Sequence, residues 1–200
     1  MSAALQRRFH RLSHGPSVSH VVAGHPRRHA LETFIRNTFR QAYAADVPAF
    51  APNLMLLEEH SRSLAAVGWR SAAEEALFLE SYLDAPIEHE IGRLAGQVVP
   101  RERIVEVGNL AAARPGSSVD LILLLAAHLD LLGFEWVVFT ATSELISIFR
   151  RLGLPLLALA QANPERLGDE ALAWGRYYDT RPVVVAGRIR MALDKGGERG

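Results

Sequence analysis

The stretch Ile104-Val105-Glu106-Val107-Gly108-Asn109-Leu110-Ala111 decides the fold of this chain. Apolar residues dominate it, which predicts a buried strand, yet it contains a carboxylate and an amide. A short loop, Arg114-Pro115-Gly116-Ser117-Ser118, follows it and leads into a long apolar helix. A strand end, a glycine-bearing loop and a helix N-terminus together form a place where α/β folds commonly bind anions. We therefore expect the functional site around Glu106.

Alternation along this strand predicts that Glu106 and Gly108 lie on one face and Val107 and Asn109 on the other. Burying an ionised carboxylate is costly, so Glu106 is expected to take a proton from a substrate or to form a structural ion pair with Arg70. One pair can do both. The missing side chain of Gly108 leaves room for a substrate. Asn109 either binds a substrate carbonyl or satisfies a β-bulge.

The pattern outside this strand predicts the remaining elements. Pro86 opens a short amphipathic helix, and Gly68 indicates a bulge or a close backbone approach. The expected strands are 17–23, 53–58, 63–70, 104–110, 135–141, 154–160 and 183–189, and the expected helices are 29–43, 86–96, 118–132 and 143–152. This order predicts one α/β domain with a mixed sheet of about six to seven strands flanked by helices. The domain is expected at 17–193, between a flexible basic tail at 1–16 and a disordered tail at 194–200.

Composition excludes several classes of function. Twenty-two basic residues balance twenty-two acidic ones, which argues against generic nucleic-acid binding. The absence of cysteine removes disulfides, thiolate nucleophiles and cysteine metal sites. Histidines recur at helical spacing only in pairs, so we expect no metal site. No apolar run is long enough to span a membrane and no segment resembles a signal peptide, so we expect a cytoplasmic protein.

A first resemblance lies at the end of the helix predicted at 143–152. Phe149-Arg150-Arg151-Leu152-Gly153-Leu154 looks like the GNAT N-acyltransferase pattern of an aromatic, two polar residues, an aliphatic and Gly-Phe. In many GNAT enzymes the aromatic is a tyrosine that protonates the departing coenzyme A thiolate. Here it is Phe149, which cannot donate a proton, and Tyr177 or Tyr178 is the candidate to replace it. The loop at 114–118 keeps one glycine and two hydroxyls of the GNAT pyrophosphate loop.

A closer resemblance is to the thermostable hemolysins, a GNAT-like branch, over roughly residues 30–190. It is carried by PNL at 52–54, AVGWRSA at 66–72, LFLESYLDAPIE at 77–88, VEVGNLA at 105–111 and GFEWVVFTAT at 133–142. The same blocks are distantly similar to the acyl-homoserine-lactone synthases. Arg70 and Glu106 match two residues of that family's pattern, whereas Asn109 stands where that family has arginine.

These resemblances imply an N-acyltransferase that moves an acyl group from an acyl-coenzyme A or acyl carrier protein thioester to a small amine, without a permanently bound cofactor. The implied catalytic residues are Glu106, Arg70 and Asn109. The donor is expected to bind at Leu110, Arg114, Gly116, Ser117 and Ser118. The substrate pocket is expected at Trp69, Glu80, Tyr177 and Tyr178.

Purely structural roles remain open for several of these residues. Ser117 or Ser118 can simply cap the following helix, and the aromatic residues can be core. Arg150 and Arg151 either dock an acyl carrier protein or complement the end of their helix. At the level of function, the alternatives are a catalytically silent acyl-binding module and a membrane-active hemolysin, as the family name suggests.

Overall fold

The computed structural model describes residues 16–114 and 116–198, and within them seven strands form one sheet in the order β1-β2-β3-β4-β5-β7-β6. The strands are β1 Ser17–Val21, β2 Asn53–Glu59, β3 Arg62–Ser71, β4 Ile104–Ala112, β5 Trp136–Ala141, β6 Leu157–Gln161 and β7 Val183–Arg188. The helices are α2 Arg28–Tyr43, α3 Ile87–Ala95, α4 Ser117–Leu131, α5 Ser143–Arg151 and α6 Ile189–Glu198. Short 3-10 segments are η1 Phe78–Tyr82, η2 Arg101–Arg103, η3 Pro164–Trp174 and η4 Tyr177–Thr180. The mixed sheet and the predicted order of elements up to β7 are confirmed, whereas the sequence did not predict α6.

The sheet has a change of strand direction at its centre. β4 pairs with β5 in parallel, whereas all other neighbouring strands are antiparallel. A parallel pair needs a crossover connection, and α4 supplies it. The apolar residues of β4 and α4 therefore belong to the same structural unit at the middle of the molecule.

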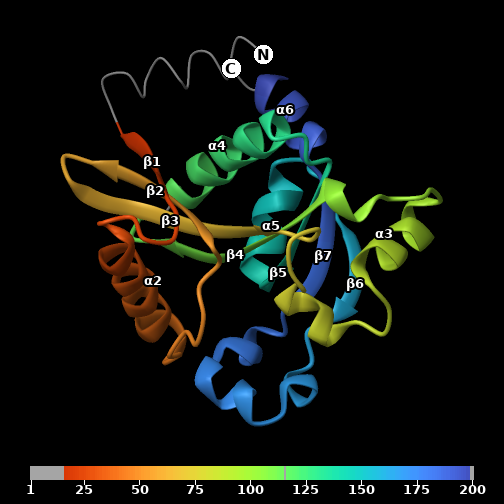
Figure 1. Ribbon diagram of the computed structural model, residues 1–200, viewed down its shortest axis with the longest axis horizontal. Helices are drawn as coiled ribbons and strands as arrows, with labels where there is room; N and C mark the ends of the chain where they lie inside the picture. The colour runs from red at the N-terminus through yellow and green to blue at the C-terminus, as the bar shows by residue number, and fades with distance from the viewer. Residues whose placement is uncertain (1–15, 115, 199–200) are drawn as a thin grey trace.

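Helices cover both faces of the sheet (Figure 1), with α4 and α6 on one side and α2 on the other. The apolar stripe of α2 repeats at four-residue spacing and buries Leu31, Ile35 and Phe39. On the opposite face, α4 buries Leu121, Leu125 and Leu129 against β2–β5. The segments η1 and α3 cover the part of the sheet formed by β5, β6 and β7.

Two local predictions differ from the structure. The sequence predicts Ser117 or Ser118 as the cap of α4, but Gly116 occupies the N-cap position with φ 89° and no side chain caps the helix. The hydroxyl of Ser117 instead donates to the carbonyls of Leu64 and Arg114, because this side chain faces the β3 side of the helix. The last helix continues to Glu198, past the point at which the sequence predicts a disordered tail. Residues 1–15 of the predicted basic tail lie outside the described residues.

The close approach predicted at Gly68 is confirmed. A Cβ atom at this position would lie 2.8 Å from Cβ of Ala51 and 2.9 Å from Oδ1 of Asn109. Such distances are shorter than real contacts, so any side chain here would push the segment before β2 away from the sheet.

Candidate active site

A cavity of about 380 Å³ opens where β4 and β5 separate. The two strands share only three register pairs, the last of which is Glu106 with Val138. Beyond that pair neither strand has a register partner in the other, and the residues from Glu106 to Leu110 line the cavity. Backbone polar groups on the two facing strand edges are therefore available to a ligand.

The cavity has two parts, one on each side of the sheet. The apolar arm lies on the α4 side, and its wall includes Val107, Leu110, Ile122, Leu125, Ala126, Leu129, Phe139, Phe149, Leu154 and Met191. The aromatic arm lies on the other side, and its wall includes Phe39, Tyr43, Phe78, Tyr82, Trp174, Tyr177 and Tyr178. A ligand with a long apolar chain and a more polar head matches this division.

A β-bulge at Asn109 corrects the predicted alternation of β4. Asn109 has a positive φ of 52°, and two residues of β4 lie opposite Val67 of β3. Asn109 consequently lies on the same face as Glu106 rather than on the face of Val107, as alternation had predicted. Its Oδ1 accepts from the backbone N–H of Ala51 at 2.9 Å and its Nδ2 donates to the carbonyl of Ala49 at 3.3 Å.

Glu106 is a buried carboxylate held by three groups. Its Oε2 accepts from the backbone N–H of Phe78 at 2.9 Å, and its Oε1 accepts from that of Leu79 at 3.0 Å. The Nε of Arg70 lies 3.4 Å from Oε2, and the two residues are register partners in β3 and β4. Burial raises the pKa of Glu106, while the two N–H groups and Arg70 oppose the rise. A carboxylate with a raised pKa beside a cavity has the properties of a proton acceptor.

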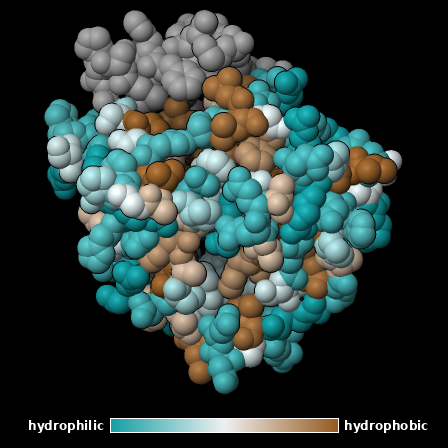
Figure 2. Space-filling model, in the orientation of Figure 1, coloured by the Kyte–Doolittle hydropathy of each residue, from teal (hydrophilic) through white to brown (hydrophobic). Residues whose placement is uncertain are grey.

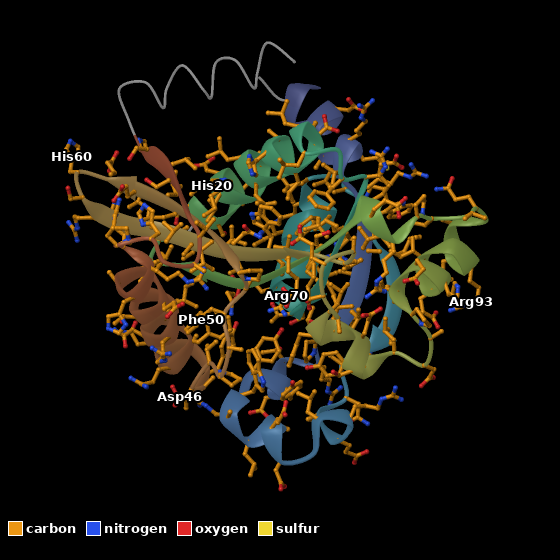
Figure 3. The ribbon with its side chains drawn as sticks, viewed as in Figure 1. His20, Asp46, Phe50, His60, Arg70 and Arg93 are labelled. Atoms are coloured by element: carbon orange, nitrogen blue, oxygen red, sulfur yellow. The ribbon has the colours of Figure 1, made fainter. Side chains whose placement is uncertain are left out.

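Arg70 lies near the middle of the molecule (Figure 3) and contacts a second carboxylate. The Nη1 atom of Arg70 is 3.5 Å from Oε2 of Glu75, and the Arg70 side chain is only 19% exposed. The guanidinium is thus shared by Glu106 and Glu75. The ion pair predicted between Arg70 and Glu106 is present.

The backbone donors of Glu106 come from η1, which a second ion cluster fixes in place. Arg101 donates to both oxygens of Glu80, at 2.6 and 2.8 Å, and to Glu88 at 2.7 Å. Glu80 also accepts from the N–H groups of Leu77 and Ile87. The Arg101 guanidinium lowers the pKa of Glu80 to about 2. Glu80 therefore joins η1 to the start of α3, and it is not in the cavity wall.

The aromatic arm is a continuous set of rings from α2, η1, η3 and η4. Ring centroids lie 5.7 Å apart for Phe78 and Trp174, 5.6 Å for Trp174 and Tyr177, and 5.3 Å for Tyr177 and Tyr43. The hydroxyls of Tyr82 and Tyr178 share a hydrogen bond of 2.6 Å. Burial raises the pKa of both phenols, so they stay protonated and can donate hydrogen bonds at neutral pH.

The structure brings together some of the predicted site residues. The cavity wall contains Glu106, Asn109, Leu110, Ser118, Tyr177 and Tyr178. Trp69 is instead buried under α4 against His128 and Phe134. Arg114 and Gly116 are exposed, as are Arg150 and Arg151 on α5.

Sequence reasoning predicted Tyr177 and Tyr178 at the pocket but missed Phe39, Tyr43 and Phe78 of the aromatic arm. The N–H groups of Phe78 and Leu79 give no signal in a sequence, because any residue supplies a backbone donor. Tyr43 ends α2, and no local pattern there indicates that α2 faces the cavity. Phe149, noted for its lack of a hydroxyl, packs 5.1 Å from Phe139 between ring centroids at the apolar arm.

Solved structures with a similar fold include those of an N-acyl amino acid synthase and of acyl-homoserine-lactone synthases. The chain is similar to FeeM, an N-acyl amino acid synthase from uncultured soil microbes, with TM-score 0.61 and 14% identity over 90% of this chain and 94% of that one. The acyl-homoserine-lactone synthase LasI gives TM-score 0.60 and 13% identity over 89% and 94%. The coenzyme A-dependent acyl-homoserine lactone synthase MesI gives 0.57 and 16% over 91% and 94%. At these identities the likeness concerns the fold, which is GNAT-like as predicted.

A search of curated proteins finds no match. The protein-family comparison is specific, because one model, described as thermostable hemolysin, matches residues 21–193 and so includes every strand from β2 to β7. This range contains β4, its bulge, the η1 segment and the walls of both cavity arms. The chain therefore belongs to the thermostable hemolysin family and has a GNAT-like fold.

Proposed function

We propose that this protein is an N-acyltransferase that moves an acyl group from a thioester donor, acyl-coenzyme A or acyl carrier protein, to a small amine. The observation that carries the proposal is the cavity that passes through the sheet between β4 and β5, with Glu106 beside the gap. An acyl chain in the apolar arm would place its thioester carbonyl at the gap. An amine in the aromatic arm would then approach the carbonyl carbon from the Glu106 side.

The chemistry needs a base and a polar environment for the carbonyl oxygen. The amine nitrogen attacks the carbonyl carbon, the new C–N bond forms, and the C–S bond breaks. Glu106 takes the surplus proton from the nitrogen and the sulfur takes up a proton as it leaves. The unpaired backbone edges of β4 and β5 supply hydrogen bonds to the carbonyl oxygen as negative charge develops there. Positioning of this kind requires no permanently bound cofactor.

The other predicted site residues receive roles that fit their contacts. Arg70 holds and orients Glu106. Asn109 shapes the bulge, since both polar atoms of its amide contact Ala49 and Ala51. Tyr178 is the proposed hydroxyl donor in place of Phe149, because it lines the cavity and its hydroxyl bonds that of Tyr82.

The headgroup of the thioester donor is proposed to bind at the start of α4, outside the apolar arm that holds its acyl chain. Ser118 lines the cavity there and Arg114 is exposed nearby in sequence, which supports binding of a phosphate at this helix end. If the donor is an acyl carrier protein, Arg150 and Arg151 on α5 would contact its acidic surface. A cytoplasmic location suits these donors, because acyl thioesters are intracellular metabolites.

The test is release of free thiol from acyl-coenzyme A or acylated carrier protein in the presence of a panel of amines, with the acylated amine identified by mass spectrometry. We expect release that depends on the amine and falls at least a hundredfold in Glu106→Gln. Wild-type protein without turnover on any donor would contradict the proposal. Thermal stabilisation by acyl thioesters without turnover would instead support a catalytically silent acyl-binding module.

A further inference from the structure

The charged groups around the cavity indicate which chemical class of acceptor amine the cavity can bind. Among the described residues, the charged side chains of the cavity wall are Glu106, Glu144 and Arg188. Glu144 is an exposed residue of the first turn of α5, which begins just beyond Thr140, whose carbonyl accepts from the hydroxyl of Tyr177 at 3.4 Å. Burial raises the pKa of Tyr43, and the Glu144 carboxylate adds to this rise. Glu106 and Glu144 thus both lie at the aromatic arm, which gives that arm a negative charge.

The one cation in this set lies away from the arm. Arg188 is at the end of β7 and pairs with Trp136 at the start of β5. Its guanidinium stacks on the Trp136 ring at 4.6 Å from the centroid. Thr140, at the wide end of the gap, is four residues further along β5, or about 13 Å at the usual rise of a strand. Stacking on Trp136 thus holds the Arg188 guanidinium at the closed end of the β4–β5 ladder.

Arg70 is next to Glu106 but is already neutralised. Two carboxylates, those of Glu106 and Glu75, lie within 3.5 Å of its guanidinium. The three side chains together carry one net negative charge. A substrate carboxylate placed here would meet two carboxylates and a guanidinium that already pairs with both of them, which is repulsive overall.

The rings complete the argument. An ammonium group is attracted to the faces of Tyr, Trp and Phe rings, and more so when water is excluded. The aromatic arm presents seven such rings beside two carboxylates, namely Phe39, Tyr43, Phe78, Tyr82, Trp174, Tyr177 and Tyr178. Rings with carboxylates form a site for a cation rather than for a zwitterion.

We propose that the acceptor is an amine without a carboxylate, of the arylalkylamine or alkyl diamine class, and not an amino acid. Its ammonium enters the aromatic arm and loses one proton to solvent to become the nucleophile. Glu106 takes the second nitrogen proton as the C–N bond forms, as in the proposed reaction. In a diamine the second ammonium lies near Glu144. This inference rests on the proposed N-acyltransferase function and adds the class of the amine to it.

The experiment compares amines with the amino acids that differ from them only by the carboxylate. Tyramine is paired with tyrosine, and putrescine with ornithine, each with the same acyl-coenzyme A series and the full-length chain. We expect kcat/KM to be at least tenfold higher for the amine of each pair. Equal or faster acylation of the amino acids would overturn the inference while leaving the N-acyltransferase function in place.

If no acceptor is acylated, the proposed function has failed, and the inference is then decided by binding. In that case tyramine and putrescine should still raise Tm more than tyrosine and ornithine, and an equal or smaller rise would overturn the inference. A variant provides a further measurement. Glu144→Gln removes an exposed carboxylate and should raise KM for putrescine about two- to fivefold more than KM for tyramine. Equal changes in the two KM values would contradict the role of Glu144.

Discussion

Gly68 and Gly108 are register partners in β3 and β4, and their missing side chains serve different purposes. Residues directly opposite in an antiparallel pair point to the same face. A Cβ at Gly68 would clash with Ala51 and Asn109, whereas a Cβ at Gly108 would have no atom within 4 Å. The first glycine lets two backbone segments pack, and the second leaves the cavity open.

This difference gives a paired prediction. Gly68→Ala should lower the free energy of unfolding by about 1–3 kcal/mol through overpacking. Gly108→Val should leave the protein folded, because valine suits a strand, and should reduce thiol release at least tenfold by filling the gap beside Glu106. Urea unfolding and the thiol assay on both variants check this. An active Gly108→Val enzyme would contradict the placement of the reaction at the gap.

The pH dependence of the reaction provides a second prediction at this scale. Burial raises the pKa of Glu106, so the acid limb of kcat/KM should lie above the ordinary glutamate pKa of about 4.3. Activity falls as the pH drops through this pKa, because the base becomes protonated. The limb should be missing from the residual activity of Glu106→Gln. An unchanged limb in that variant would assign the titration to another group.

Single residues were predictable where their chemistry is unusual for their position. A carboxylate in an apolar strand identified Glu106, and strand register made Arg70 its partner. The side of the sheet reached by Asn109 was not predictable from alternation, since it depends on one residue with positive φ. Asparagine adopts this conformation more readily than most residues, but the sequence contains no sign that it does so here.

At the scale of elements, the 3-10 segment η1 determines the environment of Glu106, and the Glu80–Arg101 pair fixes η1. Arg101→Met should therefore lower the free energy of unfolding by about 1–3 kcal/mol at pH 7, because Glu80 loses its charged donor. Arg93→Met is the matched control. Arg93 lies at the periphery (Figure 3), its side chain is 63% exposed, and among the described residues it pairs only with Glu90. Its loss should therefore cost less than about 0.5 kcal/mol.

The pH dependence of this difference tests its cause. The folded-state pKa of Glu80 is about 2, below its unfolded value. Its stabilising contribution is therefore complete above the unfolded pKa and is lost as the pH falls towards 2. The difference between wild type and Arg101→Met should shrink between pH 5 and pH 2.5 in urea unfolding. A constant difference would assign the effect to the hydrogen bond from Arg101 to Ala72 instead.

The sequence predicted the long elements better than the short ones. Regular periodicity identified α2, a long apolar run identified α4, and β-branched runs identified β5 and β7. The sequence assigns residues 72–83 to neither a helix nor a strand, because η1 has no period of its own and is held by side chains distant in sequence, Glu106 and Arg101. Tyr43 and Phe78 of the aromatic arm were missed for the same reason, since the rings of the arm come from four separate elements.

At the scale of the whole molecule, the family name suggests lysis of membranes. No helix of the described residues is long and apolar enough to cross a bilayer. On the face drawn in Figure 2, apolar residues form separate patches among polar ones. A product that joins an acyl chain to an amine is itself an amphiphile, and it offers another origin for lytic activity.

We therefore expect dye release from liposomes only when protein, acyl thioester and amine are all present. Release should disappear in Glu106→Gln and should follow the concentration of acylated amine. The control is purified protein with either substrate alone. Lysis by protein without substrates would favour a membrane-active protein over an enzyme.

The overall order of elements was predictable because each strand and helix has a local signal. The cavity was not, because it results from the separation of two strands that both have ordinary sequences. Nothing in Val137, Val138 or Phe139 indicates that β5 leaves β4 after three register pairs. The sequence therefore predicted a site at the strand that lines the cavity, but not the cavity itself.

The brevity of the β4–β5 pairing also has a mechanical consequence. It divides the sheet into two antiparallel halves, β1–β4 and β5–β7, which share one short parallel ladder and the α4 crossover. A ladder of three residue pairs is the weakest line in the sheet, so local opening should begin there. A ligand that contacts both halves should therefore hold them together and oppose this local opening. Amide exchange in β5 should slow when an acyl thioester binds, and exchange in the β2–β3 hairpin, remote from the ladder, should stay the same.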